Sequence, residues 1–283
     1  VKTVIPYFNN FLKCIPNLQS LAKVSETKLL KHWQGLGYYS RAKNLKKSAK
    51  MIINNYKGRL PNNFEELKKL PGVGDYTASA ISAIAFNKQI IPLDGNIERV
   101  LKRILNLKRE EEIKKENLHK QKKIFGKTSR SSDYVQALME IGALLCKPKN
   151  PYCNKCPITK NCLSFKRNDF EIKKKGKKII DKFYLATLYK NDDRLLLIKN
   201  DKFKFLKNLL IFPMKEITQS DSLLKSSKKL NVKMSNMNMS ISIDFSHIKN
   251  RPKNGVWIEK TKLENYIVPT FTKKIFASVR HNL

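Results

Sequence analysis

Apolar residues recur at helical spacing through the first half of the chain. Ser25 precedes one such segment as a cap, and glycines end that segment. The predicted helices occupy residues 25–37, 41–56, 62–70, 94–107 and 132–145, and VKTVIPYFNNFLK at the start reads as a further helix. None of these segments alternates apolar and polar residues as a strand does, so residues 1 to about 145 are predicted to be all-α.

The pattern changes from Phe183 onward. Short stretches that are rich in β-forming residues or alternate in polarity predict strands at 183–190, 194–199, 239–245 and 255–260. Turn residues separate these strands. The Lys- and Asn-rich residues 225–233 are predicted to form a loop. The second half is therefore expected to be a mixed α and β domain.

The length of the chain limits the number of domains, and its charge indicates the kind of partner. The chain has 283 residues, enough for two domains with separate cores. We predict a helical domain at 1–164, a basic linker at 165–182 and a second domain at 183–283. The formal charge of +35 points to a polyanionic partner, most often nucleic acid. No apolar run approaches the roughly 20 residues needed to cross a bilayer, and the first residues lack a signal-peptide layout, so a cytoplasmic location is predicted.

Four of the five cysteines lie close together near the end of the helical half. Cys146, Cys153, Cys156 and Cys162 have the spacing C-x6-C-x2-C-x5-C. Such a cluster indicates a metal site in a reducing compartment rather than disulfides. Four thiolates at this spacing can hold either tetrahedral zinc or a [4Fe-4S] cluster. Cys14 is isolated and is predicted to be a small buried apolar residue.

The stretch LPGVGDYTA at 70–78 places two glycines between two helical segments. Gly72, Val73 and Gly74 permit positive φ and close approach, and they leave backbone N–H groups free at a helix N-terminus. Such a turn can bind a phosphate without a charged side chain. It can equally be an ordinary turn between two helices with a glycine C-cap.

This hairpin, Asp94 in LDGN and the cysteine spacing together resemble the helix-hairpin-helix DNA glycosylase superfamily that carries an iron-sulfur cluster. The segments GLGYYSRAKNL (35–45) and LDGNIERV (93–100) are similar to its MutY-type adenine DNA glycosylase branch. The resemblance covers essentially the whole chain.

The resemblance implies a DNA glycosylase of base excision repair that removes adenine opposite 8-oxoguanine or guanine in double-stranded DNA. It also implies a nucleoid-associated monomer with a [4Fe-4S] cluster held by the four clustered cysteines. The implied fold is multidomain. An all-α helix-hairpin-helix glycosylase domain with its iron-sulfur loop at 146–162 is followed by a Nudix-like α/β domain.

Breaking an N-glycosidic bond needs a negative charge near the sugar and an acid that protonates the departing base. Asp94 suits the first role, although an Asp at this position is also a typical helix cap. The resemblance implies that Asp94 is the catalytic carboxylate. It also implies that Asn96 helps to position Asp94, with simple capping as the alternative.

Tyr76 stands where the related endonuclease III branch has a lysine, whose amine forms a Schiff base with the opened sugar. A tyrosine offers no such amine. The resemblance therefore implies a monofunctional glycosylase that leaves an abasic site. The alternative is an endonuclease III-like glycosylase and lyase acting on damaged pyrimidines, which Tyr76 and the second domain disfavour.

The general acid of the family is a glutamate just upstream of the segment that matches VKTVIPYF. It is therefore expected to precede Val1 and to be absent from the chain as given. Glu26 and Glu98 do not match its motif. A non-catalytic lesion-binding protein is for this reason a further alternative.

An enzyme that flips a base out of the duplex must fill the gap left behind. Tyr38 resembles the intercalating aromatic residue of the family, whereas Tyr39 is predicted to lie in the core. The alternative is that both tyrosines are packing residues. Arg41 is predicted on the basic exposed face of the following helix, where it can contact DNA or only solvent.

The second domain resembles the Nudix-like domain with which the MutY-type branch reads 8-oxoguanine. The glutamate-rich Nudix box is missing, so recognition without pyrophosphate hydrolysis is expected. The family carries a Phe-Ser-His loop ahead of an alternating strand. Ser235 and Asn236 precede such a strand and are the preferred match. Phe245, Ser246 and His247 reproduce the three residues literally, but the sequence after them does not predict a strand.

Overall fold

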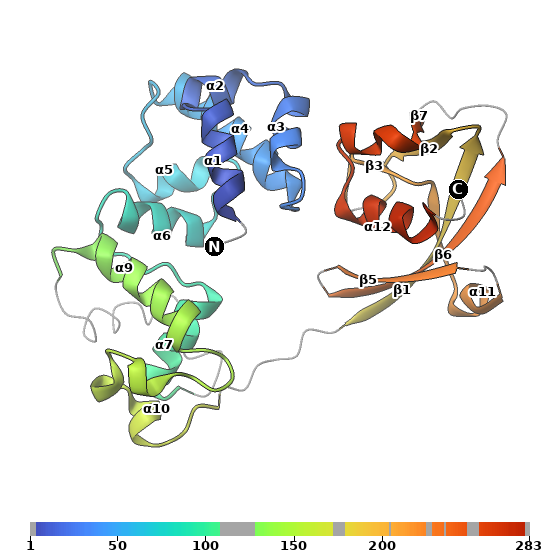
Figure 1. Ribbon diagram of the computed structural model, residues 1–283. Coiled ribbons are helices and arrows are strands. Elements are labelled where there is room, and N and C mark those ends of the chain that lie inside the picture. The colour runs from blue at the N-terminus through green and yellow to red at the C-terminus, as the bar shows by residue number, and fades with distance from the viewer. Residues whose placement is uncertain are drawn as a thin grey trace. The chain divides into compact units, whose positions relative to one another are not determined.

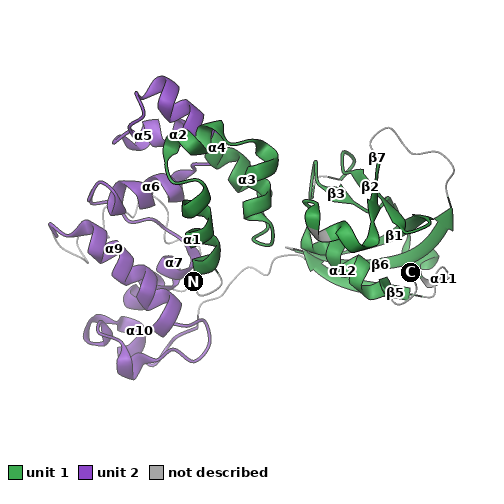
Figure 2. Cartoon of the chain, turned by 45° about the horizontal axis from the view of Figure 1, so that its top comes forward, with its two compact units in different colours: residues 1–46, 177–283 green, residues 47–176 purple. Residues whose placement is uncertain are grey.

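The computed structural model describes residues 4–107, 128–171, 179–203, 205–224, 228–234, 236–247 and 255–280. The chain forms two compact units, coloured separately in Figure 2. Residues 1–46 and 177–283 form the sheet-containing unit, and residues 47–176 form the helical unit. Within the described residues, no helix has the length and apolar character needed to cross a membrane.

Helices make up the first part of the chain (Figure 1). The α-helices are α1 (Val4–Cys14), α2 (Leu18–Lys23), α3 (Glu26–Trp33), α4 (Tyr39–Asn55), α5 (Phe64–Lys69), α6 (Asp75–Ile84), α7 (Gly95–Leu105), α9 (Ser131–Glu140) and α10 (Leu163–Lys166). Between α9 and α10 lie the π-helix η3 (Ile141–Leu145) and the 3-10 helices η4 (Cys153–Lys155) and η5 (Thr159–Asn161). No strand occurs among the described residues before Ile180, so the prediction of helices in the first half is confirmed for that part of the chain.

Local capping chemistry sets several helix starts. The Ser25 side chain accepts a hydrogen bond from the Lys28 backbone N–H at 3.2 Å and caps α3. The Asn63 side chain accepts from two backbone N–H groups at the start of α5. A cap of this kind stabilises a helix by about 1 kcal/mol. These starts follow from neighbouring residues alone, which explains why sequence reasoning located them.

Helix α7 is the centre of the helical unit. Its residues Ile97, Val100, Leu101 and Ile104 are buried and form one cluster with residues of α9 and η3. Burying each such side chain contributes about 1.5–3 kcal/mol. This packing fixes the position of α7 in the helical unit, and with it the residues at the N-terminus of α7.

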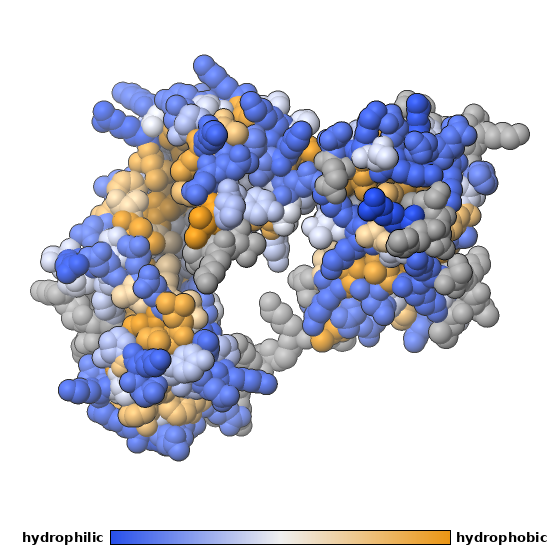
Figure 3. Space-filling view, in the orientation of Figure 1, coloured by the Kyte–Doolittle hydropathy of each residue, from blue (hydrophilic) through white to orange (hydrophobic). Residues whose placement is uncertain are grey.

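Helix α1 belongs to the sheet-containing unit and has no buried residue. Its Val4, Ile5, Phe8 and Leu12 are among the exposed large hydrophobic residues, and orange patches of this kind appear between hydrophilic residues in Figure 3. Cys14, at the end of the same helix, is exposed, so the prediction that it is buried is wrong. Its apolar side chain has no core to enter because the described structure leaves the whole helix at the surface.

A seven-stranded sheet dominates the sheet-containing unit. Its strands are β1 (Ile180–Asn191), β2 (Arg194–Lys199), β3 (Leu210–Ile211), β4 (Met214–Ile217), β5 (Lys228–Met234), β6 (Met237–His247) and β7 (Gly255–Glu259). The order is β3-β2-β1-β6-β5, with β4 paired to β1 and β7 paired to β2. β1 and β6 run parallel, and the other pairs are antiparallel.

Two helices pack against this sheet. Phe271, Ile275 and Val279 of α12 (Thr270–Val279) join the core cluster on the face that carries Tyr184 and Ile241. Helix α11 (Gln219–Leu224) contacts β1 and β6, and its buried Ser222 lies 3.5 Å from Ser242. Because neighbouring strand residues point to opposite faces, α11 and α12 cover opposite sides of the sheet. The prediction of an additional α and β domain is confirmed at this level.

Strand β5 corrects one expectation. The composition of residues 225–233 predicts a loop, but Lys228–Met234 pairs with β6 from Lys228↔Ile243 to Met234↔Met237. β5 is an edge strand, so its outward side chains can be Lys and Asn without loss of core. The sheet also begins at Ile180, three residues before the predicted domain boundary at 183.

Candidate active site and cysteine loop

Asp94 occupies the N-cap of α7, with extended φ and ψ of −103° and 174°. Its Oδ1 accepts hydrogen bonds from the backbone N–H of Asn96 at 3.0 Å and of Ile97 at 2.7 Å. These are two of the N–H groups that a helix start leaves without internal partners. Asp94 is thus a helix cap, and the cap holds its carboxylate in one orientation beside the helix N-terminus.

Asn96 adds a contact to the second oxygen of this carboxylate. Its Nδ2 lies 3.4 Å from Asp94 Oδ2 and donates toward it. Asn96 therefore contacts both carboxylate oxygens, one through its backbone and the other through its side chain. This geometry agrees with the positioning role predicted for Asn96, while the catalytic role of the pair stays a prediction.

Tyr76 lies near Asp94 in the first turn of α6 and is 43% exposed. Partial burial, and after it the negative charge of Asp94, raise the pKa of Tyr76. The phenol therefore remains protonated and neutral at physiological pH. An O–H group close to a carboxylate can donate a hydrogen bond, but it supplies no amine.

The predicted hairpin connects α5 and α6. Gly72 has φ of +81°, a conformation that favours glycine, and the Val73 N–H donates to the Leu70 carbonyl at 3.0 Å. Gly74 is the N-cap of α6 and provides no side-chain cap. The Ser48 hydroxyl donates to the Pro71 carbonyl at 2.8 Å and ties the hairpin to α4. The first turn of α6 accordingly offers backbone N–H groups that no capping side chain covers.

Tyr38 and Tyr39, in the sheet-containing unit, have opposite environments. Tyr38 is 73% exposed and has φ of +45°, whereas Tyr39 is 7% exposed. The indole N–H of Trp33 donates to the Gly37 carbonyl at 3.0 Å and supports this loop. Tyr39 is in the core as predicted, and the loop presents Tyr38 to solvent. Arg41 is exposed, as expected for the basic face of α4.

Arg99 is the part of this site that sequence reasoning missed. It is 7% exposed and its guanidinium donates from Nη2 to Asn96 Oδ1 at 3.0 Å and to the Gly142 carbonyl at 2.6 Å. Its Nε donates to the Cys146 carbonyl at 2.7 Å. One buried side chain therefore joins the Asp94 cap to the start of the cysteine loop.

The burial of Arg99 also affects the pKa of its guanidinium. Burial lowers the pKa of Arg99, and Arg103 lowers it further, while Cys146 and Asp94 act in the opposite direction. The available sequence signal was a pair of arginines four residues apart beside the apolar positions of IERVLKRIL. Arginines so placed on an amphipathic helix can lie at the edge of the core and bond to buried carbonyls.

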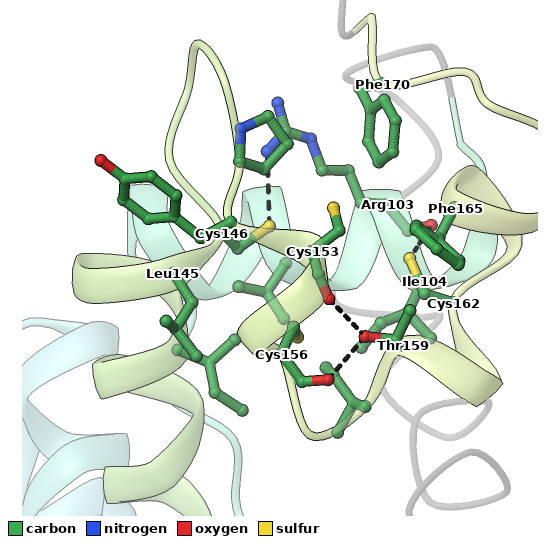
Figure 4. Close-up of a pocket in the computed structure, with 15 residues that line it drawn as sticks. Arg103, Ile104, Leu145, Cys146, Cys153, Cys156, Thr159, Cys162, Phe165 and Phe170 are labelled. Atoms are coloured by element: carbon green, nitrogen blue, oxygen red, sulfur yellow. Dashed lines mark hydrogen bonds between the residues drawn. The ribbon is translucent and has the colours of Figure 1, made fainter.

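The four clustered cysteines line one cavity beside α7 (Figure 4). None of them forms a disulfide. Arg103 donates from Nη1 toward Cys146 Sγ at 3.4 Å and to the Lys147 carbonyl at 2.6 Å. The Thr159 hydroxyl lies 2.8 Å from the Cys153 carbonyl and 2.5 Å from the Cys156 carbonyl. Hydrogen bonds from side chains thus shape the loop around the cavity.

The thiols are also close enough to interact electrostatically. Burial, followed by the charges of the other three cysteines, raises the pKa of Cys153. In the part of the chain that the structure describes, no three His, Cys, Asp or Glu side chains are disposed around a single metal ion. In a [4Fe-4S] cluster each thiolate binds a different iron, so the sulfur atoms surround a cavity and need not converge on one point.

The candidates for lesion recognition lie in and beside β6. Ser235 is outside the described residues. Asn236 lies between β5 and β6, and its carbonyl accepts from the Ile180 N–H at 2.9 Å.

Phe245, Ser246 and His247 are instead the last three residues of β6. They pair with β1 in the parallel ladder, and Lys190 Nζ lies 4.6 Å from the centre of the Phe245 ring. The structure therefore places Asn236 of the first candidate at a turn and the second candidate within a paired strand.

Comparison with known proteins gives consistent matches. Residues 1–124 match the family described as HhH-GPD superfamily base excision DNA repair protein. The chain is 37% identical over 219 residues to the adenine DNA glycosylase of Buchnera aphidicola subsp. Schizaphis graminum, covering 75% of this chain and 63% of that protein. It is 37% identical over 253 residues to the adenine DNA glycosylase of Buchnera aphidicola subsp. Baizongia pistaciae, covering 87% of this chain and 70% of that protein.

More distant relatives and solved structures agree. The human adenine DNA glycosylase is 36% identical over 174 residues, which cover 60% of this chain and 32% of that protein. A thermostable thymine-DNA glycosylase structure matches 58% of this chain and 76% of its own, with a TM-score of 0.51 and 28% identity. A non-covalent endonuclease III–DNA complex matches 59% of this chain and 78% of its own, with a TM-score of 0.50 and 25% identity. The chain spans less than two thirds of the length of several of these relatives.

Proposed function

The chain belongs to the adenine DNA glycosylase family, and from this premise we propose that it removes adenine from duplex DNA by hydrolysing the N-glycosidic bond. The observation that carries the proposal is the Asp94 carboxylate, which two backbone N–H groups hold at the start of α7. The relatives named above are adenine DNA glycosylases. The substrate proposed is adenine opposite 8-oxoguanine or guanine.

Asp94 acts through its charge in this proposal. As the base departs, positive charge develops on the sugar, and a carboxylate held nearby stabilises it. Its Oδ1 is occupied by the backbone of α7, so the carboxylate cannot swing away from the sugar. The Asn96 amide donates to the second oxygen at 3.4 Å and helps to fix the orientation of the carboxylate.

Tyr76 limits the reaction to base removal. A lyase needs an amine that attacks the sugar carbon and forms a Schiff base. Tyr76 has none, and its raised pKa keeps the phenol neutral beside Asp94. The proposed product is therefore an intact strand with an abasic site.

A duplex containing labelled adenine opposite 8-oxoguanine tests these two steps. The full-length protein is expected to release adenine and to leave the strand uncut until alkali is added. Borohydride added to a duplex with an abasic site is expected to trap no covalent complex. Efficient trapping would instead assign the protein to the endonuclease III-like lyases, and the absence of any adenine release would favour a lesion-binding protein.

We propose that Cys146, Cys153, Cys156 and Cys162 hold a [4Fe-4S] cluster. Four thiols around one cavity, with no disulfide among the described cysteines, fit such a group. The bound cluster would supply a rigid cross-link for the cysteine loop. Elemental analysis of the purified protein is expected to find about four irons and four sulfides per chain, as a [4Fe-4S] cluster requires. One zinc and no iron would contradict this assignment.

DNA contacts are proposed for both units. The hairpin around Gly72 and Gly74 and the uncapped first turn of α6 suit a phosphate, whereas the Val73 N–H is bonded to the Leu70 carbonyl. The exposed Tyr38 suits insertion into the base stack. The charge of +35 supports a polyanionic ligand, as does the likeness to a glycosylase solved with DNA. We propose a monomer that acts on DNA in the cytoplasm, at the nucleoid.

The sheet at the end of the chain is proposed to be a Nudix-like domain that reads 8-oxoguanine, joined to the glycosylase domain through residues 165–182. Ser235 and Asn236 remain the preferred readers because they directly precede the alternating strand β6, as the family's loop precedes its strand. The backbone of Phe245, Ser246 and His247 is paired with β1 along the parallel ladder. Those three residues consequently have less freedom to contact a base edge.

A further inference from the structure

The cysteine loop begins with an unusual helical turn. Helix α9 passes directly into the five-residue π-helix η3, in which the Cys146 N–H donates to the Ile141 carbonyl at 2.7 Å. A π-turn contains one residue more than an α-turn, and such turns recur at functional sites. Here the turn directs the Gly142 carbonyl to Arg99 Nη2, at 2.6 Å.

Gly142 lies against Asn96 with no room for a side chain. A Cβ atom at Gly142 would lie 2.8 Å from Asn96 Cβ and 3.2 Å from both the carbonyl carbon and the carbonyl oxygen of Asn96. The first distance is shorter than real Cβ atoms adopt, and the other two involve backbone. Backbone atoms cannot rotate away from a clash as the end of a flexible side chain can.

Glycine is not needed at this position for its backbone conformation. Gly142 is not among the residues with positive φ. In a helix with ordinary dihedral angles, glycine is less favourable than alanine because it loses more conformational entropy on folding. Close approach to Asn96 is the requirement that the structure does show.

We propose that Gly142 is a positioning residue for base removal: its missing side chain admits Asn96 against η3 and so sets the Asp94 carboxylate. This inference rests on the proposed function. The contact acts through Asn96, whose backbone N–H and side-chain amide both bond to Asp94. Helix α7 cannot retreat as a whole because its buried residues lock it into the core. A methyl group at Gly142 therefore displaces the cap residues themselves.

The experiment compares Gly142→Ala with Ala143→Ser, a change at the exposed neighbouring position of the same π-helix. In the full-length protein, Gly142→Ala is expected to lower the single-turnover rate of adenine release by about 100-fold, the effect of a catalytic group misplaced by about 1 Å. DNA affinity and iron content are expected to equal those of the parent, and unfolding is expected to remain cooperative. Ala143→Ser is expected to leave the rate unchanged. A Gly142→Ala rate equal to that of the parent would overturn the proposal.

Substitutions at Asn96 separate positioning from a general loss of structure. Gly142→Ala is expected to lower the rate as strongly in an Asn96→Ala background, which keeps the clashing Cβ, but much less in an Asn96→Gly background, which removes it. Equal losses in both backgrounds would contradict a route through the contact with the Asn96 Cβ.

Crystal structures of the parent and of Gly142→Ala provide a test that does not depend on activity. Asn96 and Asp94 are expected to be displaced in the variant, and an unmoved Asn96 would refute the inference. If the parent releases no adenine, the proposed function fails, while the displacement still decides whether Gly142 positions Asp94.

Discussion

The Asp94 end of α7 and the turn between β5 and β6 differ in how the protein fixes them. At Asp94, side-chain hydrogen bonds contribute to the geometry. The Asn96 amide donates to the carboxylate, and the guanidinium of the buried Arg99 donates to Asn96. At the turn, Asn236 is held through its main chain, since its carbonyl accepts a hydrogen bond from the Ile180 N–H. The first region depends on particular side-chain atoms in addition to the backbone of α7, whereas the second depends on strand pairing.

This difference predicts different tolerance to change. A network of buried hydrogen bonds loses its geometry when one member changes, because the remaining groups cannot find water. A turn held by strand pairing keeps its backbone when a side chain is exchanged. The pairing of β5 with β6 is therefore expected to survive substitution of Asn236.

The largest effect is expected for Asp94→Asn. The substitution removes the charge but keeps an oxygen that can cap α7, so DNA binding and folding persist. Adenine release is expected to fall by roughly 1,000-fold, as for the loss of a preorganised electrostatic group. Single-turnover assays measure the rate, and Asp133→Asn, at an exposed residue of α9, is the matched control. Retained turnover in Asp94→Asn would remove the catalytic role assigned to this carboxylate.

Arg99→Lys tests the side-chain network behind Asp94. A lysine cannot reproduce the fork that bonds to Asn96 and to the Gly142 and Cys146 carbonyls. The free energy of unfolding is expected to fall by about 2 kcal/mol because buried acceptors lose their donor. Denaturant unfolding measures this loss.

The control for that loss is Arg130→Lys, at an exposed arginine paired with Asp133. It is expected to change the free energy of unfolding by no more than about 0.5 kcal/mol. Equal effects of Arg99→Lys and Arg130→Lys would show that the network adds nothing to stability.

Tyr38→Ala tests the side chain that a loop with positive φ at Tyr38 exposes to solvent. Folding is expected to be unaffected because Tyr38 is largely exposed. The binding free energy for duplex DNA is expected to weaken by about 1–3 kcal/mol, the contribution of one aromatic stacked on a base. Titration of a labelled duplex measures the affinity. Tyr39→Phe, at the buried neighbour, is the control and should leave the affinity unchanged. An unaltered affinity in Tyr38→Ala would exclude insertion of Tyr38 into the base stack.

The smallest effect is expected at the sheet. Asn236→Ala should lower the preference for adenine opposite 8-oxoguanine over guanine by about fivefold, equivalent to the loss of one hydrogen bond. His247→Ala, in the competing stretch, should leave that preference unchanged. Parallel measurements of the rate of adenine release from the two duplexes decide which stretch recognises 8-oxoguanine. The reverse result would move lesion recognition to the end of β6.

Local features of the candidate site could be predicted from sequence. Asp94 caps α7, Gly72 has the positive φ that its hairpin needs, and Tyr39 is buried beside an exposed Tyr38. The cysteine spacing likewise predicts that the four thiols share one place, and they line one cavity. Each of these depends on residues a few positions apart, so the chain's own short-range geometry determines it.

Other features escaped prediction because they depend on distant partners. Residues 225–233 are predicted to form a loop from their Lys and Asn content, although Leu230, Val232 and Met234 alternate with polar residues as in a strand. The edge position of β5 is what tolerates its polar residues. Cys14 is exposed because the helix that carries it is not buried.

The sequence by itself determined the change from helices to strands along the chain, several helix starts, the cysteine spacing and the presence of Tyr76 beside the hairpin. Only the tertiary structure decided that Arg99 is buried between the Asp94 cap and the cysteine loop, and that Gly142 must lack a side chain. The reason is physical. Caps and turns form between neighbours along the chain, whereas the contact between Gly142 and Asn96 joins residues far apart in sequence and exists only when η3 packs against α7.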